Sequence, residues 1–167
     1  MEYVKEKGVL VVGITDFAPM DYKDESGEWI GFDADMAKAF ADSLGVDVEF
    51  TAVTAATRTE LLDSGDIDCV LATFTITEER KKSWDFTTPY YTDYVTVLVE
   101  DASGIKTLAD LKDKKVGVSS GSTSGKALVK AMIEAGVLSG DGFDADSFDP
   151  ATWTDGVSFA QYDDYPT

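Results

Sequence analysis

An arginine placed just beyond a buried strand is the feature of this sequence best suited to do chemistry. Residues 74–82 follow the apolar run 69–72, and this succession predicts a strand that passes into a helix. Thr77 is the expected N-cap, which puts Arg80 on the first turn beside the end of the strand. A guanidinium there can hold a carboxylate by two parallel, charge-assisted hydrogen bonds. The alternative is a surface arginine that pairs with Glu79, an interaction worth less than about 1 kcal/mol.

A second arginine, Arg58, also begins a predicted helix that follows a strand. Cations are mildly unfavourable at this end of a helix, because the helix dipole places partial positive charge there. The position therefore favours a role in receiving a second anionic group. Surface pairing with Glu60 or Asp63 is the alternative.

Residues 119–126 supply hydroxyl groups at another transition from strand to helix, where backbone N–H groups and the helix dipole attract anions. The segment is close to a nucleotide P-loop in composition. However, Ser120 stands in the place of the first required glycine, and Ala127 stands where that motif has serine or threonine. We therefore expect Ser122 and Thr123 to contact a carboxylate, with an ordinary capped helix start as the alternative.

Two carboxylate-bearing segments complete the candidates. Asp16 and Phe17 follow the predicted strand 9–14, where Asp16 can accept from an ammonium group. Phe17 can stack on a ligand or simply close the edge of the sheet. Asp33 is expected to cap a helix, in preference to forming a catalytic pair or a metal site with Asp35.

The composition excludes several classes of function. The 167 residues include 32 acidic and 14 basic side chains, so a net charge of -18 makes binding to nucleic acid unexpected. The sequence has no histidine, which excludes histidine-based proton relays, Ser-His-Asp triads and histidine-ligated zinc. No metal and no cofactor is expected. No apolar run approaches the roughly 18 residues that a membrane span requires.

The order of the predicted elements indicates an α/β fold with a largely parallel sheet. In the first part we expect strands at 9–14, 46–50 and 67–73, a hairpin at 20–23 and 29–32, and helices at 34–44 and 57–64. In the second we expect strands at 95–99, 115–118 and 157–160, helices at 107–112 and 124–135, and a helix start at 163–167. The ligand crevice of such a fold lies beyond the carboxyl ends of its strands.

Taken together, these motifs resemble the polar amino-acid receptors of bacterial ABC importers, the solute-binding proteins of family 3. The matching segments, whose order and spacing fit over essentially the whole chain, are 12–19, 31–35, 61–68, 72–82, 85–91, 107–111 and 116–123. The resemblance implies a two-lobed, periplasmic-binding-protein-like fold of type II with parallel-rich sheets, with lobe I at 1–94 and lobe II at 95–167. Joined by crossover strands, the two lobes of such a receptor close on an amino acid.

The resemblance also implies that the chain ends before the second crossover, so that the second lobe and the C-terminal return are incomplete. The acidic residue that holds the ligand ammonium group in the family would then be absent, and affinity would be weakened. Apolar surface left exposed on the first lobe would favour domain swapping or another associated oligomer.

By the same resemblance, Arg80 would hold the α-carboxylate of the ligand. Its helpers would be Thr75, Ser122 and Thr123, while Phe17 would form an apolar wall and Thr73 a contact near the ammonium group. Arg58 resembles the arginine that receives the side-chain carboxylate in the aspartate/glutamate branch of the family. The turn after the first strand is one residue shorter than in the family, which leaves open whether Asp16 or Thr15 faces the ligand.

We therefore expect a binding protein, periplasmic or extracellular and in one version lipid-anchored, that captures aspartate, glutamate or glutamine. An acidic amino acid is the favoured ligand, the permease of an ABC importer is the expected partner, and no enzymatic activity is expected. Two alternatives remain open. One is an enzyme on the same lobes, such as a cyclic-acid dehydratase or a murein lyase, and the other is the sensory ectodomain of a receptor.

Overall fold

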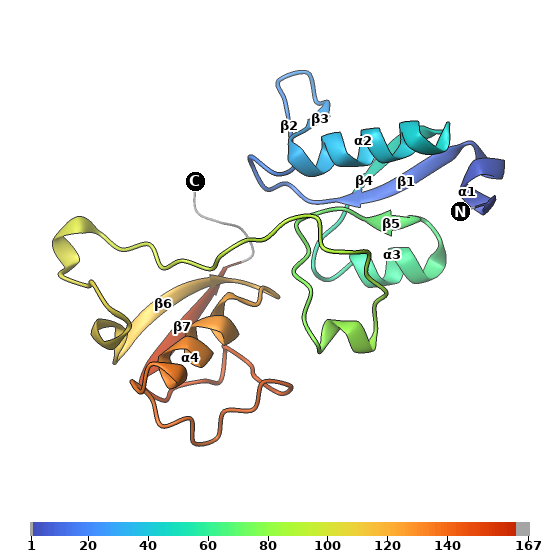
Figure 1. The fold of residues 1–167 in the computed structure, drawn as a ribbon. Helices are drawn as coiled ribbons and strands as arrows, with labels where there is room; N and C mark the ends of the chain where they lie inside the picture. Colours follow the sequence, from blue (N-terminus) through green and yellow to red (C-terminus); the bar gives the residue numbers. More distant parts are fainter. Residues whose placement is uncertain (1, 163–167) are drawn as a thin grey trace. The chain divides into compact units, whose positions relative to one another are not determined.

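The chain was analysed as a computed structural model, which describes residues 2–162 (Figure 1). It divides into two compact units, here called unit 1, which ends at Thr75, and unit 2, which begins at Ile76. The boundary between lobes that the sequence predicts at 94/95 refers to the two-lobed fold of the family. It stays a prediction. The helix start expected at 163–167 lies outside the described residues.

Unit 1 is an α/β unit with a three-stranded parallel sheet in the order β4-β1-β5. Its elements are α1 (Glu2–Lys7), β1 (Val9–Ile14), β2 (Tyr22–Lys23), β3 (Trp29–Ile30), α2 (Phe32–Leu44), β4 (Asp47–Ala52), α3 (Arg58–Ser64) and β5 (Cys69–Val70). The apolar run of β1 is central, and Leu10, Val12 and Ile14 are buried as the sequence predicts for such a strand. Helix α2 lies along β1 and β4 in Figure 1 and turns Ala37 and Ala41 into the core.

Two expectations for unit 1 are wrong in detail. Asp33 does not cap α2, because the N-cap position belongs to Gly31 and the Asp33 carboxylate bonds to Thr73. The strand expected at 67–73 pairs with β1 only at Cys69–Val70. The strand could not in any case run through Thr73, whose left-handed backbone conformation, with φ of 46°, does not fit a pleated strand.

Over residues 76–162, unit 2 contains one parallel pair of strands and one long helix. Its elements are the 3₁₀ helices η1 (Arg80–Lys82), η2 (Asp101–Ser103) and η3 (Leu108–Leu111), followed by β6 (Lys114–Ser119), α4 (Ser124–Glu134) and β7 (Val157–Tyr162). Val129 and Met132 of α4 are wholly buried, and Phe159 of β7 belongs to the same core. The segment 136–155 carries no helix or strand, as expected, and adds Phe148 and Trp153 to this core.

Unit 2 also differs from expectation at three elements. Residues 95–99 form no strand in the described structure, where this largely apolar run has no partner strand. They run extended beside an apolar groove of about 540 Å³, which α4 and η3 also line. The helix expected at 107–112 is the shorter η3. It begins with a capping box between Thr107 and Asp110. The helix expected to begin at Thr77 is the single turn η1.

None of the helices within residues 2–162 has the length and apolar character needed to cross a membrane.

Candidate functional site

The three parallel strands of unit 1 deliver five of the eight candidate residues to one edge of the sheet. Asp16 and Phe17 follow β1, Arg58 follows β4 at the start of α3, and Thr73 and Thr75 follow β5. Carboxyl ends of neighbouring parallel strands lie at the same edge, which is where α/β sheets bind ligands.

The chain that leaves β1 is held by a buried carboxylate that sequence reasoning missed. Asp21 is wholly buried, and its Oδ2 accepts hydrogen bonds from the backbone N–H of Thr15 at 3.1 Å and from the Thr15 hydroxyl at 2.8 Å. Phe17 and Asp21 also exchange backbone hydrogen bonds across a single antiparallel bridge. The turn thus engages Thr15 inside the unit and leaves Asp16 exposed, which favours Asp16 as the residue that meets a ligand.

Burial also changes the acidity of Asp21. Desolvation raises the pKa of its carboxyl group to about 6, and the neighbouring carboxylates of Asp33 and Asp16 act in the same direction, against the hydrogen bonds from Thr15. Its Oδ1 is buried without a hydrogen-bond partner. The sequence signal for this group is an acidic residue between the apolar Met20 and the aromatic Tyr22.

A second buried carboxylate holds the chain that leaves β5. Asp33, on the first turn of α2, is wholly buried, and its Oδ2 accepts from Thr73 N at 2.5 Å and from Thr73 Oγ1 at 2.8 Å. The carboxylate is further stabilised by its place near the N-terminus of a helix. Thr73 and Thr75 are both half-buried at this exit.

Arg58 stacks on an aromatic ring in place of pairing with an acid. Its guanidinium carbon lies 4.0 Å from the centroid of the Phe74 ring, a cation–π contact. Within residues 2–162 no ion pair joins Arg58 to Glu60, to Asp63 or to any other carboxylate. Burial lowers the pKa of the guanidinium, which nevertheless stays a cation. A stacked, half-buried arginine of this kind can receive a carboxylate.

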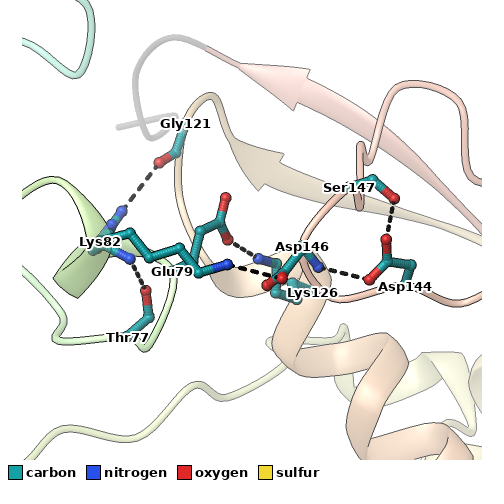
Figure 2. A network of polar contacts seen from close by, with 9 residues as sticks. Thr77, Glu79, Lys82, Gly121, Lys126, Asp144, Asp146 and Ser147 are labelled. Atoms are coloured by element: carbon teal, nitrogen blue, oxygen red, sulfur yellow. Dashed lines mark hydrogen bonds and ion pairs between the residues drawn. The ribbon is translucent and has the colours of Figure 1, made fainter.

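Unit 2 brings Arg80 to the hydroxyl-rich loop between β6 and α4. Arg80 opens η1, and its backbone N–H donates to Thr77 Oγ1 at 3.1 Å. The N-cap position of η1 nevertheless belongs to Glu79, so the expectation that Thr77 is the N-cap is wrong. One guanidinium nitrogen, Nη2, donates to the Gly121 carbonyl at 3.5 Å, a long contact drawn in Figure 2. The loop therefore places Ser122 and Thr123 next to the residue that the guanidinium contacts.

Neighbouring ion pairs tie η1 to the rest of unit 2 (Figure 2). Glu79, the surface partner considered for Arg80, pairs with Lys126 of α4, and Lys82 pairs with Asp146 at 2.9 Å. Asp144 accepts from Asp146 N at 3.0 Å. These groups are mostly exposed, so each pair is worth little by itself.

The two hydroxyls of the loop differ in their bonding. Ser122 Oγ accepts from the Ser124 N–H at 3.4 Å, near the limit for a hydrogen bond. Thr123 occupies the N-cap position of α4, yet its side chain makes no capping hydrogen bond. The alternative of an ordinary cap is therefore not what the structure has at Thr123, and this hydroxyl is available to an external acceptor.

The described residues contain no cluster of three or more histidine, cysteine, aspartate or glutamate side chains arranged to hold a metal ion.

Sequence comparisons match this chain to bacterial extracellular solute-binding proteins. Residues 10–147 match the model of the bacterial extracellular solute-binding proteins, family 3. The glutamine-binding protein of Geobacillus stearothermophilus is 38% identical over 144 residues, and the ABC transporter glutamine-binding protein GlnH of Bacillus subtilis is 42% identical over 141 residues. These matches cover 83% and 81% of this chain but only 55% and 52% of the relatives, so the chain spans about half of their length.

Structural comparisons agree with this placement. The crystal structure of an ancestral amino acid-binding protein, AncCDT-1, described as a precursor of cyclohexadienyl dehydratase, matches with a TM-score of 0.76 and 33% identity. That match covers 97% of this chain and 64% of the other. The arginine-bound form of domain 1 from TmArgBP matches with a TM-score of 0.53 and 39% identity, over 55% of this chain and 73% of the other. The two-lobed α/β architecture expected from the sequence is therefore confirmed as the fold family.

Proposed function

Because the chain belongs to the bacterial extracellular solute-binding proteins of family 3, we propose that it captures a polar amino acid outside the cytoplasmic membrane. The amino acid would pass to the permease of an ABC importer, as the name of the Bacillus subtilis relative suggests. One observation carries the proposal. The only two arginines of the sequence are both partly buried and lie beyond the ends of parallel strands, Arg58 after β4 and Arg80 against the loop that follows β6.

In unit 2, we propose that Arg80 binds the α-carboxylate of the amino acid. Its planar guanidinium suits a carboxylate through paired, charge-assisted hydrogen bonds. The hydroxyls of Ser122 and Thr123 would add two further donors. The missing capping bond of Thr123 supports this assignment, since it leaves that hydroxyl able to donate to the ligand.

In unit 1, we propose that Arg58 selects the side chain of the amino acid. Its stacking on Phe74 and the lack of an ion pair within residues 2–162 support a role in receiving a carboxylate, hence a preference for glutamate or aspartate. A neutral amide would leave part of the guanidinium unpaired, and a cationic side chain would be repelled. Asp16, Phe17, Thr73 and Thr75 are the remaining proposed contacts.

The arginine-bound domain 1 of TmArgBP supports a further point. That protein was crystallised as one domain with an amino acid bound, and it aligns with 55% of this chain. We infer that a chain of this length can also bind an amino acid. The lipid anchor and the association of copies expected from the sequence stay predictions, which membrane fractionation and sedimentation would test.

We propose that the protein performs no catalysis. The sequence offers no histidine for proton transfer, and the glutamine-binding relatives are named as binding proteins. Although AncCDT-1 is described as a precursor of a dehydratase, it is itself named an amino acid-binding protein. Incubation with prephenate-like acids or with murein should leave both unchanged, and turnover of either would favour the enzymatic alternative.

Isothermal titration of the full chain with L-glutamate, L-aspartate, L-glutamine and L-arginine tests the proposed function. We expect the acidic amino acids to bind about tenfold more tightly than glutamine. With glutamine bound, one charged donor of Arg58 would be left without an anionic acceptor, and that loss costs about this much affinity. Arginine should give no measurable heat. Failure of every amino acid to bind would overturn the proposed function, whereas tighter binding of arginine than of glutamate would overturn the acidic preference alone.

A further inference from the structure

One buried carboxylate joins two segments that are 40 residues apart in sequence. Asp33 lies on the first turn of α2, and a single oxygen, Oδ2, accepts from both the backbone N–H and the hydroxyl of Thr73. The Asp33 side chain is wholly buried, so these bonds form away from competing water. A carboxylate that accepts twice from one residue fixes both the backbone and the side chain of that residue.

The residue it holds has an unusual backbone conformation. Thr73 has φ of 46°, and among the described residues other than glycine only Asp113 also has a positive φ. The left-handed region is unfavourable for a β-branched residue, because Cβ comes too close to the carbonyl oxygen. Such a conformation persists only where surrounding contacts impose it.

The first turn of α2, which carries Asp33, is itself held against the turn that precedes β2. Asp33 N donates to the Met20 carbonyl at 2.8 Å. Gly31, with φ of 110°, lets the helix start approach this loop, because a Cβ there would lie only 2.6 Å from Met20 O. The first turn of α2, which carries the acceptor, is therefore held by contacts that do not involve Thr73.

The conformation of Thr73 bears directly on the proposed ligand contacts. Thr73 immediately precedes Phe74, whose ring carries the Arg58 guanidinium, and Thr75 follows. If Thr73 relaxed to an ordinary strand or helical conformation, the direction of the chain would change at Phe74. The platform under Arg58 would then move with it.

We propose that Asp33 is a positioning residue for ligand binding, which holds Thr73 in the left-handed conformation and so places Phe74 and Arg58. This inference rests on the proposed amino-acid-binding function. It adds to that function a residue that acts without touching the ligand. It gives Asp33, the first acidic position of the 31–35 segment, a role other than helix capping.

A double-mutant cycle on the full chain tests this role, with L-glutamate affinity measured by calorimetry. With Thr73 present, Asp33→Ala should weaken binding about tenfold, since an unassisted L residue rarely populates the left-handed region. In the Thr73→Gly background the same change should cost less than about threefold, because glycine adopts a positive φ without strain. A residue that only supported the fold would cost the same affinity in both backgrounds, and that result would overturn the proposal.

Two further variants and a second readout complete the design. Asp33→Asn keeps the volume and one acceptor and should lose less affinity than Asp33→Ala, while Asp35→Ala, an exposed change on the same turn, should lose none. Hydrogen exchange of the Thr73 amide without ligand should be slow in the wild type and Asp35→Ala and fast in Asp33→Ala. If no amino acid binds the wild type, the proposed function fails, and unchanged exchange in Asp33→Ala overturns the positioning role independently.

Discussion

Unit 1 anchors its candidate residues through buried carboxylates, whereas unit 2 anchors Arg80 and its loop through exposed groups. Asp21 and Asp33 are wholly buried and accept from Thr15 and Thr73 at the edge of the parallel sheet. In unit 2, η1 is tied to its surroundings by the pair Glu79–Lys126, whose side chains are 47% and 25% exposed, and by the even more exposed pair of Lys82 with Asp146.

This difference shows that candidate residues can be positioned either by buried hydrogen bonds to a carboxylate or by exposed ion pairs. A buried acceptor is costly to ionise, yet its hydrogen bonds are strong and little affected by salt. Exposed ion pairs are weak and are screened by salt. We therefore expect the sheet edge of unit 1 to depend on pH and the loop of unit 2 to depend on ionic strength.

The largest effect is expected from Arg80 of unit 2, the arginine proposed to bind the α-carboxylate. Arg80→Ala should weaken binding of every amino acid by at least about 100-fold, because it removes two charge-assisted hydrogen bonds worth about 1.5–3 kcal/mol each. Lys82→Ala, which removes a neighbouring exposed cation of η1, should leave affinity unchanged. Titration calorimetry compares the two variants, and equal losses would show that Arg80 acts only through net charge.

The next effect concerns stability and belongs to unit 1. Because the pKa of Asp21 is raised from 3.8 to about 6, the folded state binds more protons than the unfolded state between about pH 4 and pH 6. The free energy of unfolding should therefore fall as pH rises through this window, by up to about 3 kcal/mol. In Asp21→Asn this contribution disappears, while Asp35→Asn should keep it. Urea unfolding at several pH values measures the slopes, and identical slopes in all three proteins would contradict the assignment.

A more selective effect is expected from the other arginine, Arg58 of unit 1. Arg58→Ala should weaken glutamate binding about tenfold to 100-fold and glutamine binding less than about threefold, since only glutamate loses a charged partner. Glu60→Ala, an exposed change on the same turn of α3, should leave the ratio of the two affinities as it is. Equal losses for both amino acids in the Arg58 variant would refute this division of labour.

The smallest effect tests the exposed anchoring of unit 2. Lys126→Ala removes the partner of Glu79 and should lower the free energy of unfolding by less than about 1 kcal/mol, an effect that should vanish at high salt. Lys130→Ala, on the same helix, breaks a longer and more exposed contact with Glu134 and should cost still less. A large loss that persists in 1 M salt would mean that this anchor behaves like the buried ones.

Much of the fold could be predicted from sequence, because strands buried on both faces and helices ended by glycine leave clear patterns. Residues 9–14 form a strand with the expected bounds, and Gly45 and Gly65 end their helices in the left-handed conformation. The prediction failed at 95–99, where a largely apolar run forms a strand only if a partner strand is present. It also failed at Thr73, where a long-range bond to Asp33 overrides the local tendency to continue the strand.

The part of the candidate site that depends on residue type and spacing could be predicted from the sequence. Arginine and hydroxyl side chains near predicted strand ends could be named from spacing alone. The structure places Arg58 after β4 and Ser122 and Thr123 after β6, whereas Arg80 lies on η1 and contacts the loop after β6 through Gly121. The supporting groups could not be named this way. Asp21, Phe74 and the true role of Asp33 depend on burial and on contacts between distant segments, which a single sequence does not display.

The central claim, that one guanidinium receives the α-carboxylate and the other the side-chain carboxylate, is tested most directly by changing the ligand. Titration of the unaltered chain with L-glutamate, L-glutamine and L-isoglutamine compares an intact ligand with ligands that lack one or the other carboxylate. We predict that glutamine binds about tenfold more weakly than glutamate and that isoglutamine, which lacks the α-carboxylate, gives no measurable heat. Binding of isoglutamine as tightly as glutamate would contradict the account.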